Sequence, residues 1–238
     1  MKLIRNALVL LPATLLMANA YAPFHEKKIS EKVYRDLPVG IISTEYYAAW
    51  NLTATGLSFD AFNYAIKGYQ YLQQKKLLGN SKVLTIVDFS KPSSQKRLYV
   101  LNMVNGEVLF NSLVAHGRNS GLAYATDFSN SESSHKTSLG FYITGITYNG
   151  GNGYSLKLQG CEKGINDNAL DRAIVMHGAD YANENFIQSN GYLGRSYGCP
   201  AVPQKISKKI IDVIKNGSCM FLYHPTKKYT GVSKILNS

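Results

Sequence analysis

The sequence predicts a mainly β fold, a sandwich or small barrel, with a helical N-terminal extension and one helix on the C-terminal side. Three observations indicate this fold. From Ser81 onward the chain consists of short runs rich in β-branched and aromatic residues, and turn residues separate these runs. A helical repeat of apolar residues precedes the runs, and a second one interrupts them near the end. Seven short strands at this spacing are typical of an all-β domain.

The seven expected strands are short apolar runs. They are VLTIV, RLYVLNM, VLFNSLVAH, GFYITGITY, YSLKLQG, AIVMHG and MFLYH. Two glycine-containing segments, Val104-Asn105-Gly106 and 149–153, fit hairpins or tight connections between strands.

Two segments have the apolar spacing of helices. The first is expected over residues 58–78, where Ser58 and Asp60 suit a helix start and Gly79 stops the helix. Its apolar and aromatic residues recur at intervals of three and four: Phe59, Phe62, Ala65, Ile66, Tyr69 and Leu72. The second is expected over residues 206–216, where four isoleucines share one face before a glycine.

Residues 1–20 have the pattern of a secretory signal peptide. Lys2 and Arg5 precede an apolar stretch, and small residues at Ala18 and Ala20 suit cleavage after Ala20. A membrane anchor is the alternative, but about a dozen apolar residues interrupted by a proline fall short of the roughly twenty that span a bilayer. We therefore expect export to the periplasm or cell envelope, with no membrane span after cleavage.

The rest of the chain divides into three expected parts. Residues 21–80 form the N-terminal extension, which holds one short helix before the helix at 58–78. Residues 81–225 form the β domain, and residues 226–238 form a tail. Sequence leaves the role of the extension and the oligomeric state open.

The chain is basic, with 26 Lys and Arg against 15 Asp and Glu and a net charge of +11. Loss of Lys2 and Arg5 with the signal peptide lowers this charge by two. A basic surface favours anionic partners. Nucleic acid is a poor candidate because no clustered basic helix or zinc-ligand spacing is present, and an anionic envelope polymer fits better.

Three cysteines make an odd number for an exported protein, so at least one thiol is free or pairs between chains. A disulfide between Cys161 and Cys219 would leave Cys199 free. Two buried free thiols at these positions are the favoured alternative, but sequence alone decides neither.

Cys199 lies in the nonapeptide RSYGCPAVP, between Gly198 and Pro200. Glycine beside a nucleophile allows close substrate approach and lets backbone amides turn toward a reacting carbonyl. His177 precedes the cysteine by twenty-two residues, at the expected end of a strand where Gly178 lets the chain turn away. Because a thiol needs only a neighbouring imidazole to give useful thiolate, this pair indicates an acyl-transfer enzyme. His116, which also ends an expected strand before a glycine, is the main rival for the base.

The order of these motifs resembles a known family. His177-Gly178, a glycine-rich stretch and then Ser196-Tyr197-Gly198-Cys199 are similar to the signature of the YkuD-type L,D-transpeptidases. The resemblance covers residues 81–223, includes SSHKTSLGFYIT, and points to the branch whose loop reads Arg-Ser-x-Gly-Cys-Pro. Tyr197 departs from the family pattern, because a histidine usually stands at this position.

The resemblance implies a β-sandwich or barrel catalytic domain and a Cys-His mechanism without a cofactor or metal. Cys199 would attack a stem peptide of peptidoglycan and form a thioester, leading to 3-3 crosslinks. His177 would act as general base, the Gly178 carbonyl would fix its tautomer, and amides around Gly198 and Cys199 would receive the oxyanion.

Further loop residues are candidates for substrate contact. Arg195 has a planar fork that suits a stem carboxylate, Tyr197 and Ser196 flank the nucleophile, and Ser196 alternatively braces the loop. His116 and His135 are candidates for lining the donor groove. Two other functions stay open: an L,D-carboxypeptidase or crosslink hydrolase that uses the same pair, and a wall-binding module without turnover.

Overall fold

The computed structural model describes residues 39–238. The expected signal peptide, and the part of the expected extension up to residue 38, lie outside the described residues. Helix α2 (Val39–Ala49) and the 3-10 helix η1 (Leu52–Thr55) occupy the rest of the segment before the expected helix at 58–78.

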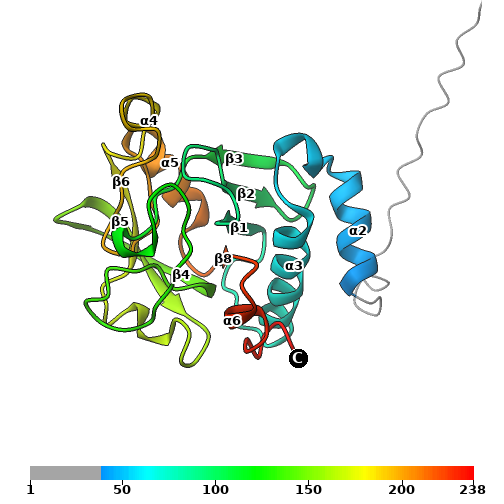
Figure 1. The fold of residues 1–238 in the computed structure, drawn as a ribbon. Coiled ribbons are helices and arrows are strands. Elements are labelled where there is room, and N and C mark those ends of the chain that lie inside the picture. Colours follow the sequence, from blue (N-terminus) through cyan, green and yellow to red (C-terminus); the bar gives the residue numbers. More distant parts are fainter. Residues whose placement is uncertain (1–38) are drawn as a thin grey trace, which may run out of the picture. The chain divides into compact units, whose positions relative to one another are not determined.

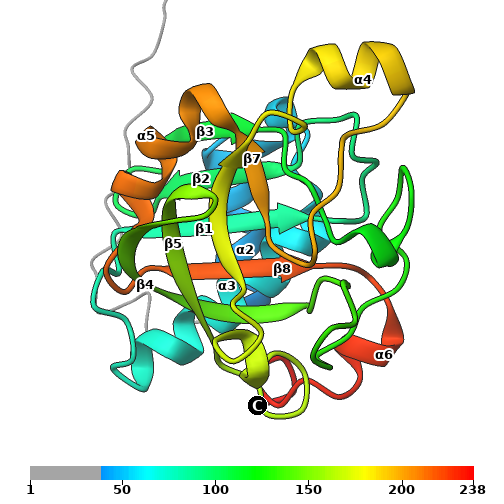
Figure 2. The same cartoon turned by 90° about the vertical axis from the view of Figure 1, so that its left-hand side faces the viewer.

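The expected mainly β fold is confirmed: eight strands form one sheet that curls into a nearly closed barrel (Figure 2). The strands lie in the order β3-β2-β1-β8-β4-β5-β6-β7. Their bounds are β1 (Val83–Asp88), β2 (Leu98–Asn102), β3 (Val108–Ser112), β4 (Gly140–Gly150), β5 (Gly153–Gly160), β6 (Val175–Ala179), β7 (Ala201–Pro203) and β8 (Cys219–Tyr223). Each of the seven expected strands overlaps one of these, and β7 is additional.

Two parallel pairs interrupt an otherwise antiparallel sheet. Strand β1 pairs with β8 in the centre, and β6 pairs with β7 at one edge. In the edge pair His177 is the register partner of Ala201, and on its other side it is opposite Ser155 of β5. This edge therefore brings the histidine strand next to the segment that follows the cysteine.

Helix α3 (Phe59–Gln74) lies within the expected range 58–78 and begins at Ser58, whose side chain accepts a hydrogen bond from the Ala61 amide. Five of the six expected apolar positions are buried, and the sixth, Phe59, is exposed. A Cβ at Gly68 would lie 2.0 Å from the Phe141 ring, so glycine is needed where the helix meets the sheet. Helix α2 packs on α3, on the side away from the sheet (Figure 1).

The second expected helix, at 206–216, is α5 (Gln204–Ile214), which begins and ends two residues earlier than its apolar spacing indicates. Ile210, Ile211 and Ile214 are buried, and the helix packs against β6. A short helix without buried residues, α4 (Glu184–Asn190), lies between β6 and the cysteine loop, and no pattern predicted it.

The last residues pack onto the domain. Helix α6 (Lys227–Thr230) presents Tyr229, whose hydroxyl donates to Glu162 Oε1 at 2.9 Å, and the Ser233 hydroxyl donates to Glu162 Oε2. Ile235 and Leu236 are buried. Residues 226–238 thus contribute to the core rather than trailing from it.

No helix within residues 39–238 has the length and apolar character needed to cross a membrane.

Candidate active site

His177 lies in the middle of β6, not at a strand end as the sequence indicated. The expectation that Gly178 lets the chain turn away is wrong, because the strand continues to Ala179. The physical reason for the glycine is close approach. A Cβ there would lie 2.3 Å from Gln204 Oε1 and 2.6 Å from Ser207 Oγ at the start of α5.

The orientation of the His177 ring follows from one contact. Nδ1 lies 2.8 Å from the carbonyl oxygen of Gly178, and a carbonyl only accepts, so Nδ1 carries the proton and Nε2 keeps its lone pair. The ring is only 4% exposed, and burial lowers its pKa below the ordinary value of 6.5. At neutral pH the imidazole is therefore neutral and able to accept a proton.

The Cys199 thiol is partly buried beside β6. Sγ accepts from the Val175 amide at 3.5 Å and donates toward the Ala173 carbonyl at 3.8 Å. Burial raises the thiol pKa above its ordinary value of 9.0, so the sulfur is protonated at neutral pH. Within residues 39–238 no hydrogen bond joins Sγ to His177. His177 stands on β6, and Cys199 lies in the loop two residues before Ala201, where β7 begins and pairs with His177.

The cysteine loop is braced by Ser196. Its hydroxyl donates to the Cys199 carbonyl at 2.6 Å and accepts from the Gly198 amide at 3.0 Å. Gly198 has φ 125°, a conformation that favours glycine, and a Cβ there would lie 2.9 Å from the Lys136 carbonyl. The Gly198 amide is thus already bonded. In the described part of the chain the Cys199 amide donates to no other residue.

A neighbouring segment holds this loop from outside. Ser196 donates through its amide to the His116 carbonyl at 2.9 Å and accepts from the Arg118 amide at 2.7 Å. The Thr137 hydroxyl accepts from the Gly117 amide at 2.9 Å and donates to the Gly198 carbonyl at 3.2 Å. These bonds fix the loop against residues 116–118.

His116 is fully buried and does not face the pocket described below. Its Nδ1 lies 2.7 Å from an Arg97 nitrogen, and because a guanidinium only donates, Nδ1 is the acceptor and Nε2–H donates to Gly121 O at 3.3 Å. Burial, followed by the charge of Arg97, lowers the pKa of His116 to about 3. Both ring nitrogens are bonded inside the protein, so this side chain does not reach the thiol or a substrate groove.

A polar pocket of about 250 Å³ lies near the thiol, although neither Cys199 nor His177 is among its lining residues. The proximity follows from Ala173, which lines the pocket and whose carbonyl contacts Sγ. The lining residues are Glu132, Ser133, His135, Asp171, Arg172, Ala173 and Tyr197. His135, a candidate for lining the donor groove, is thus one of the residues that line this pocket.

Tyr197 forms an exposed aromatic wall of this pocket. Its side chain is 65% exposed, and its ring centroid lies 4.5 Å from that of His135. The Arg118 guanidinium lies over the Tyr197 ring, 5.1 Å from its centroid. A histidine thus stands beside the loop position where the family pattern has one, but it comes from another segment.

Arg195 is half-buried at the loop start. One of its terminal nitrogens donates to the carbonyls of Arg118 and Gly121, both at 3.2 Å, and its guanidinium lies 5.7 Å from the Tyr192 ring. No carboxylate lies within ion-pair distance of Arg195 in residues 39–238.

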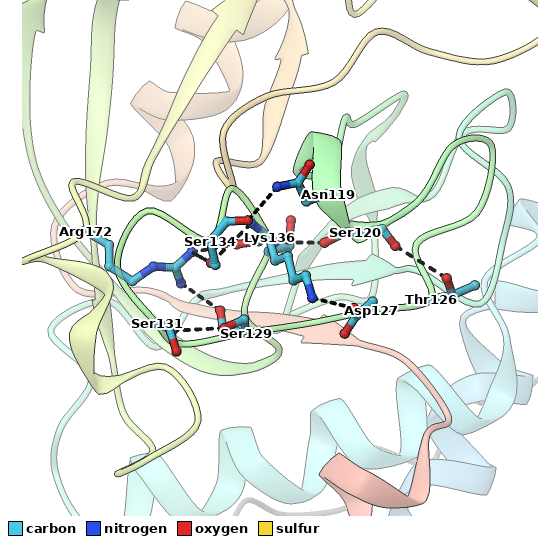
Figure 3. A network of polar contacts seen from close by, with 10 residues as sticks. Asn119, Ser120, Thr126, Asp127, Ser129, Ser131, Ser134, Lys136 and Arg172 are labelled. Carbon is cyan, nitrogen blue, oxygen red and sulfur yellow. Dashed lines mark hydrogen bonds and ion pairs between the residues drawn. The ribbon is translucent and has the colours of Figure 1, made fainter.

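Sequence reasoning missed Arg172, which contacts the segment beside the cysteine loop (Figure 3). In the sequence it is one charged residue before an apolar run, like many others in turns. Only the fold shows that residues 129–138 gather around its guanidinium.

The three cysteines are free thiols in this structure, and Cys219 is fully buried. Within residues 39–238 no three His, Cys, Asp or Glu side chains gather closely enough to hold a metal ion.

Several solved structures are similar to this chain. An L,D-transpeptidase from Mycobacterium smegmatis shares 15% identity and a TM-score of 0.38, over 60% of this chain and 59% of that one. L,D-transpeptidase 3 from Mycobacterium tuberculosis, solved with a faropenem-derived adduct, shares 12% identity and a TM-score of 0.37, over 60% of each chain. An L,D-transpeptidase from Stackebrandtia nassauensis shares 14% identity and a TM-score of 0.37, over 76% of this chain and 75% of that one. The match thus spans only about three fifths of the first two proteins.

A comparison with curated proteins gave no significant match. The model of one family, YkuD_2, described as the L,D-transpeptidase catalytic domain, matches residues 53–223. Because this match covers well over half of the chain, the chain belongs to the YkuD_2 family of L,D-transpeptidase catalytic domains.

Proposed function

We propose that the protein is a cysteine L,D-transpeptidase that forms 3-3 crosslinks between peptidoglycan stem peptides in the periplasm or cell envelope. The observation that carries the proposal is the state of two groups, one on β6 and one in the loop before its partner strand β7. His177 is neutral with Nε2 free, and Cys199 is a protonated thiol near a polar pocket. This combination suits proton transfer at the moment of attack, not a thiolate stored beforehand.

The first half-reaction forms a thioester. Nε2 of His177 takes the thiol proton while Sγ bonds to the carbonyl carbon of the third stem residue. The oxyanion accepts a hydrogen bond from the Cys199 amide, because the Gly198 amide already donates to the Ser196 hydroxyl. The tetrahedral intermediate then collapses, the bond to the terminal D-amino acid breaks, and the imidazolium returns the proton to the leaving amine.

The second half-reaction uses an amine of another stem peptide. It attacks the thioester carbonyl and gives a proton to His177, and Sγ leaves as the thiolate and recovers that proton. Water as the acceptor would give a carboxypeptidase or hydrolase through the same thioester. The acceptor alone separates the two activities.

The pocket supports a stem peptide as donor. His135 and Tyr197 offer flat faces along one wall, and Glu132 and Asp171 are exposed carboxylates at the rim that suit an ammonium group. One terminal nitrogen of Arg195 donates to the Arg118 and Gly121 carbonyls, and its remaining N–H groups could bind a carboxylate of the stem peptide at the start of the loop.

The test is a product assay with disaccharide tetrapeptide, with Cys199→Ala as the matched control. Mass spectrometry separates crosslinked dimers from free tripeptide. Dimers from the parent and none from the control support the transpeptidase. Tripeptide without dimers assigns the hydrolase, and absence of both with intact binding to peptidoglycan assigns a wall-binding module.

A further inference from the structure

Arg172 binds four acceptors with its two terminal nitrogens. One donates to the Ser129 carbonyl at 2.9 Å, and the other donates to the Lys136 carbonyl at 2.6 Å and the Ser134 hydroxyl at 3.3 Å (Figure 3). The first nitrogen also donates to the Ser138 hydroxyl at 3.2 Å. All four acceptors belong to residues 129–138. A planar guanidinium can make these bonds at once, whereas an ammonium group is a point donor.

The charge of Arg172 is not paired with a carboxylate. Among residues 39–238 the three ion pairs join Lys136 to Asp127 and two lysines to Asp212. The Arg172 guanidinium is partly buried, and its acceptors are neutral carbonyls and hydroxyls. Its positive charge is therefore not neutralised by an ion pair, although Glu132 and Asp171 line the same pocket.

The segment that Arg172 binds is strained. Ser133 and His135 have φ of 54° and 53°, and Ala173, next to Arg172, has φ of 51°. Such conformations cost non-glycine residues about 1–3 kcal/mol each and persist only where surrounding contacts hold them. The four bonds to Arg172 supply such contacts for the segment that lines the pocket.

The guanidinium also reaches the nucleophile loop. A Cβ placed on Gly198 would lie 3.3 Å from an Arg172 nitrogen and 2.9 Å from the Lys136 carbonyl that the same nitrogen binds. Arg172 is therefore packed against the residue preceding Cys199. Its charge favours the ionised thiol and opposes the effect of burial on the pKa of Cys199.

Other groups around the thiol also ionise or carry charge. They are His177 on β6, Tyr181 after β6, His135 and Lys136 of the strained segment, Tyr197 of the loop, and Glu132 and Asp171 at the pocket rim. Lys136 is half-buried and forms an ion pair with Asp127. Arg118 and Arg195 near the loop are also outside the three ion pairs, but Arg172 is the guanidinium that packs against Gly198 and acts on the Cys199 thiol.

We propose that Arg172 is a positioning residue for the reaction. Its guanidinium holds residues 129–138 against the cysteine loop, and its charge stabilises the Cys199 thiolate that develops during attack. This inference rests on the proposed role of Cys199 as the nucleophile.

The test compares Arg172→Gln and Arg172→Lys with Lys82→Met, which removes an exposed charge at the start of the sheet. Iodoacetamide alkylation of Cys199 from pH 7 to 12, followed by peptide mapping, reports the ionisation of the thiol without requiring turnover. We expect Arg172→Gln to raise the alkylation midpoint by about one pH unit or more. Arg172→Lys keeps the charge, so its midpoint stays near the parent's, but kcat/KM on tetrapeptide falls about tenfold because the planar fork is lost. Lys82→Met changes neither quantity.

A folded Arg172→Gln protein with the parental midpoint would overturn the proposal. If that variant fails to fold, Arg172→Lys decides, and parental kcat/KM in the lysine variant would contradict the positioning role. Failure of the proposed function is distinguishable, because a parent protein that forms no thioester still gives alkylation midpoints.

Discussion

Nδ1 of His177 and the carbonyl oxygen of Gly178 are 2.8 Å apart, between adjacent residues of one strand. The imidazole thus receives its tautomer from its own backbone and not from a carboxylate. Because a carbonyl is neutral, it orients the ring without the large increase in basicity that a carboxylate gives. Burial then dominates, and the imidazole pKa lies below 6.5.

The pH dependence of catalysis follows from the two groups. His177 accepts a proton only when neutral, so kcat/KM should fall on the acid side with a midpoint below 6.5 and about tenfold per further pH unit. The thiol pKa lies above 9.0, so no loss caused by the thiol is expected between pH 7 and 9. A kcat/KM profile from pH 4 to 9 measures this. An acid limb with a midpoint well above 6.5 would contradict a buried, neutral base.

His116 should affect stability and not the chemistry. Its pKa is about 3 in the folded protein and 6.5 when unfolded, so its contribution is complete above pH 6.5 and is lost as pH falls toward 3. The slope is about 1.4 kcal/mol per pH unit over that window. His116→Asn removes this slope and costs about 1–3 kcal/mol at pH 7, because Arg97 loses part of its bonding.

Urea unfolding of parent and His116→Asn at pH 5 and 7 measures the slope. The alkylation rate of Cys199 in His116→Asn should stay within a few-fold of the parent at both pH values. In contrast, His177→Ala should lower kcat by about 10²–10⁴-fold. If kcat fell by about 10²–10⁴-fold in His116→Asn instead, His116 and not His177 would be the base.

Gly178→Ala should destabilise the protein by about 1–3 kcal/mol, because the new methyl group meets Gln204 and Ser207 on α5. The double variant Gly178→Ala/Gln204→Ala removes the closer contact. A double-mutant cycle on the free energies of unfolding should show a coupling of about 0.5 kcal/mol or more that offsets part of the loss. Purely additive effects would show that the helix does not restrict this position.

Ser196→Ala should loosen the cysteine loop. The hydroxyl bonds the Gly198 amide and the Cys199 carbonyl, so its removal frees both groups and lets the Cys199 amide drift from the oxyanion position. We expect kcat to fall about tenfold or more, with KM changed less, because the lost alignment matters in the transition state. Steady-state kinetics on tetrapeptide measure this, and Ser189→Ala on α4 is the matched control. An unchanged kcat would mean that the loop holds its shape without Ser196.

Much of the fold could be predicted because its strands have strong local signals. Runs such as VLTIV and MFLYH form central strands buried along their whole length, and α3 and α5 have clear apolar faces. Strand β7 was missed because its three residues include a proline and it forms through pairing with β6 and a bridge to Ala115, both distant in the sequence. Helix α4 was missed because it buries no side chain and therefore carries no apolar repeat.

Local sequence was less informative about the surroundings of the candidate site. Gly178 was predicted to follow a strand end. In the structure a glycine is needed there because α5, which begins 26 residues later at Gln204, packs against this position. His116 resembled His177 in sequence, both preceding glycine, and only burial against Arg97 separates them. Arg172 shows its importance only through contacts with residues 129–138, which are distant in the sequence.

The central claim is that Cys199 carries the acyl group and His177 is its base. Its most direct test is rapid quenching of the protein with disaccharide tetrapeptide, followed by peptide mapping of the acid-stable thioester. We expect a tripeptide adduct on Cys199 that forms in the parent, forms much more slowly in His177→Ala, and is absent from Cys199→Ala. An adduct on another residue, or tetrapeptide turnover by Cys199→Ala, would contradict it.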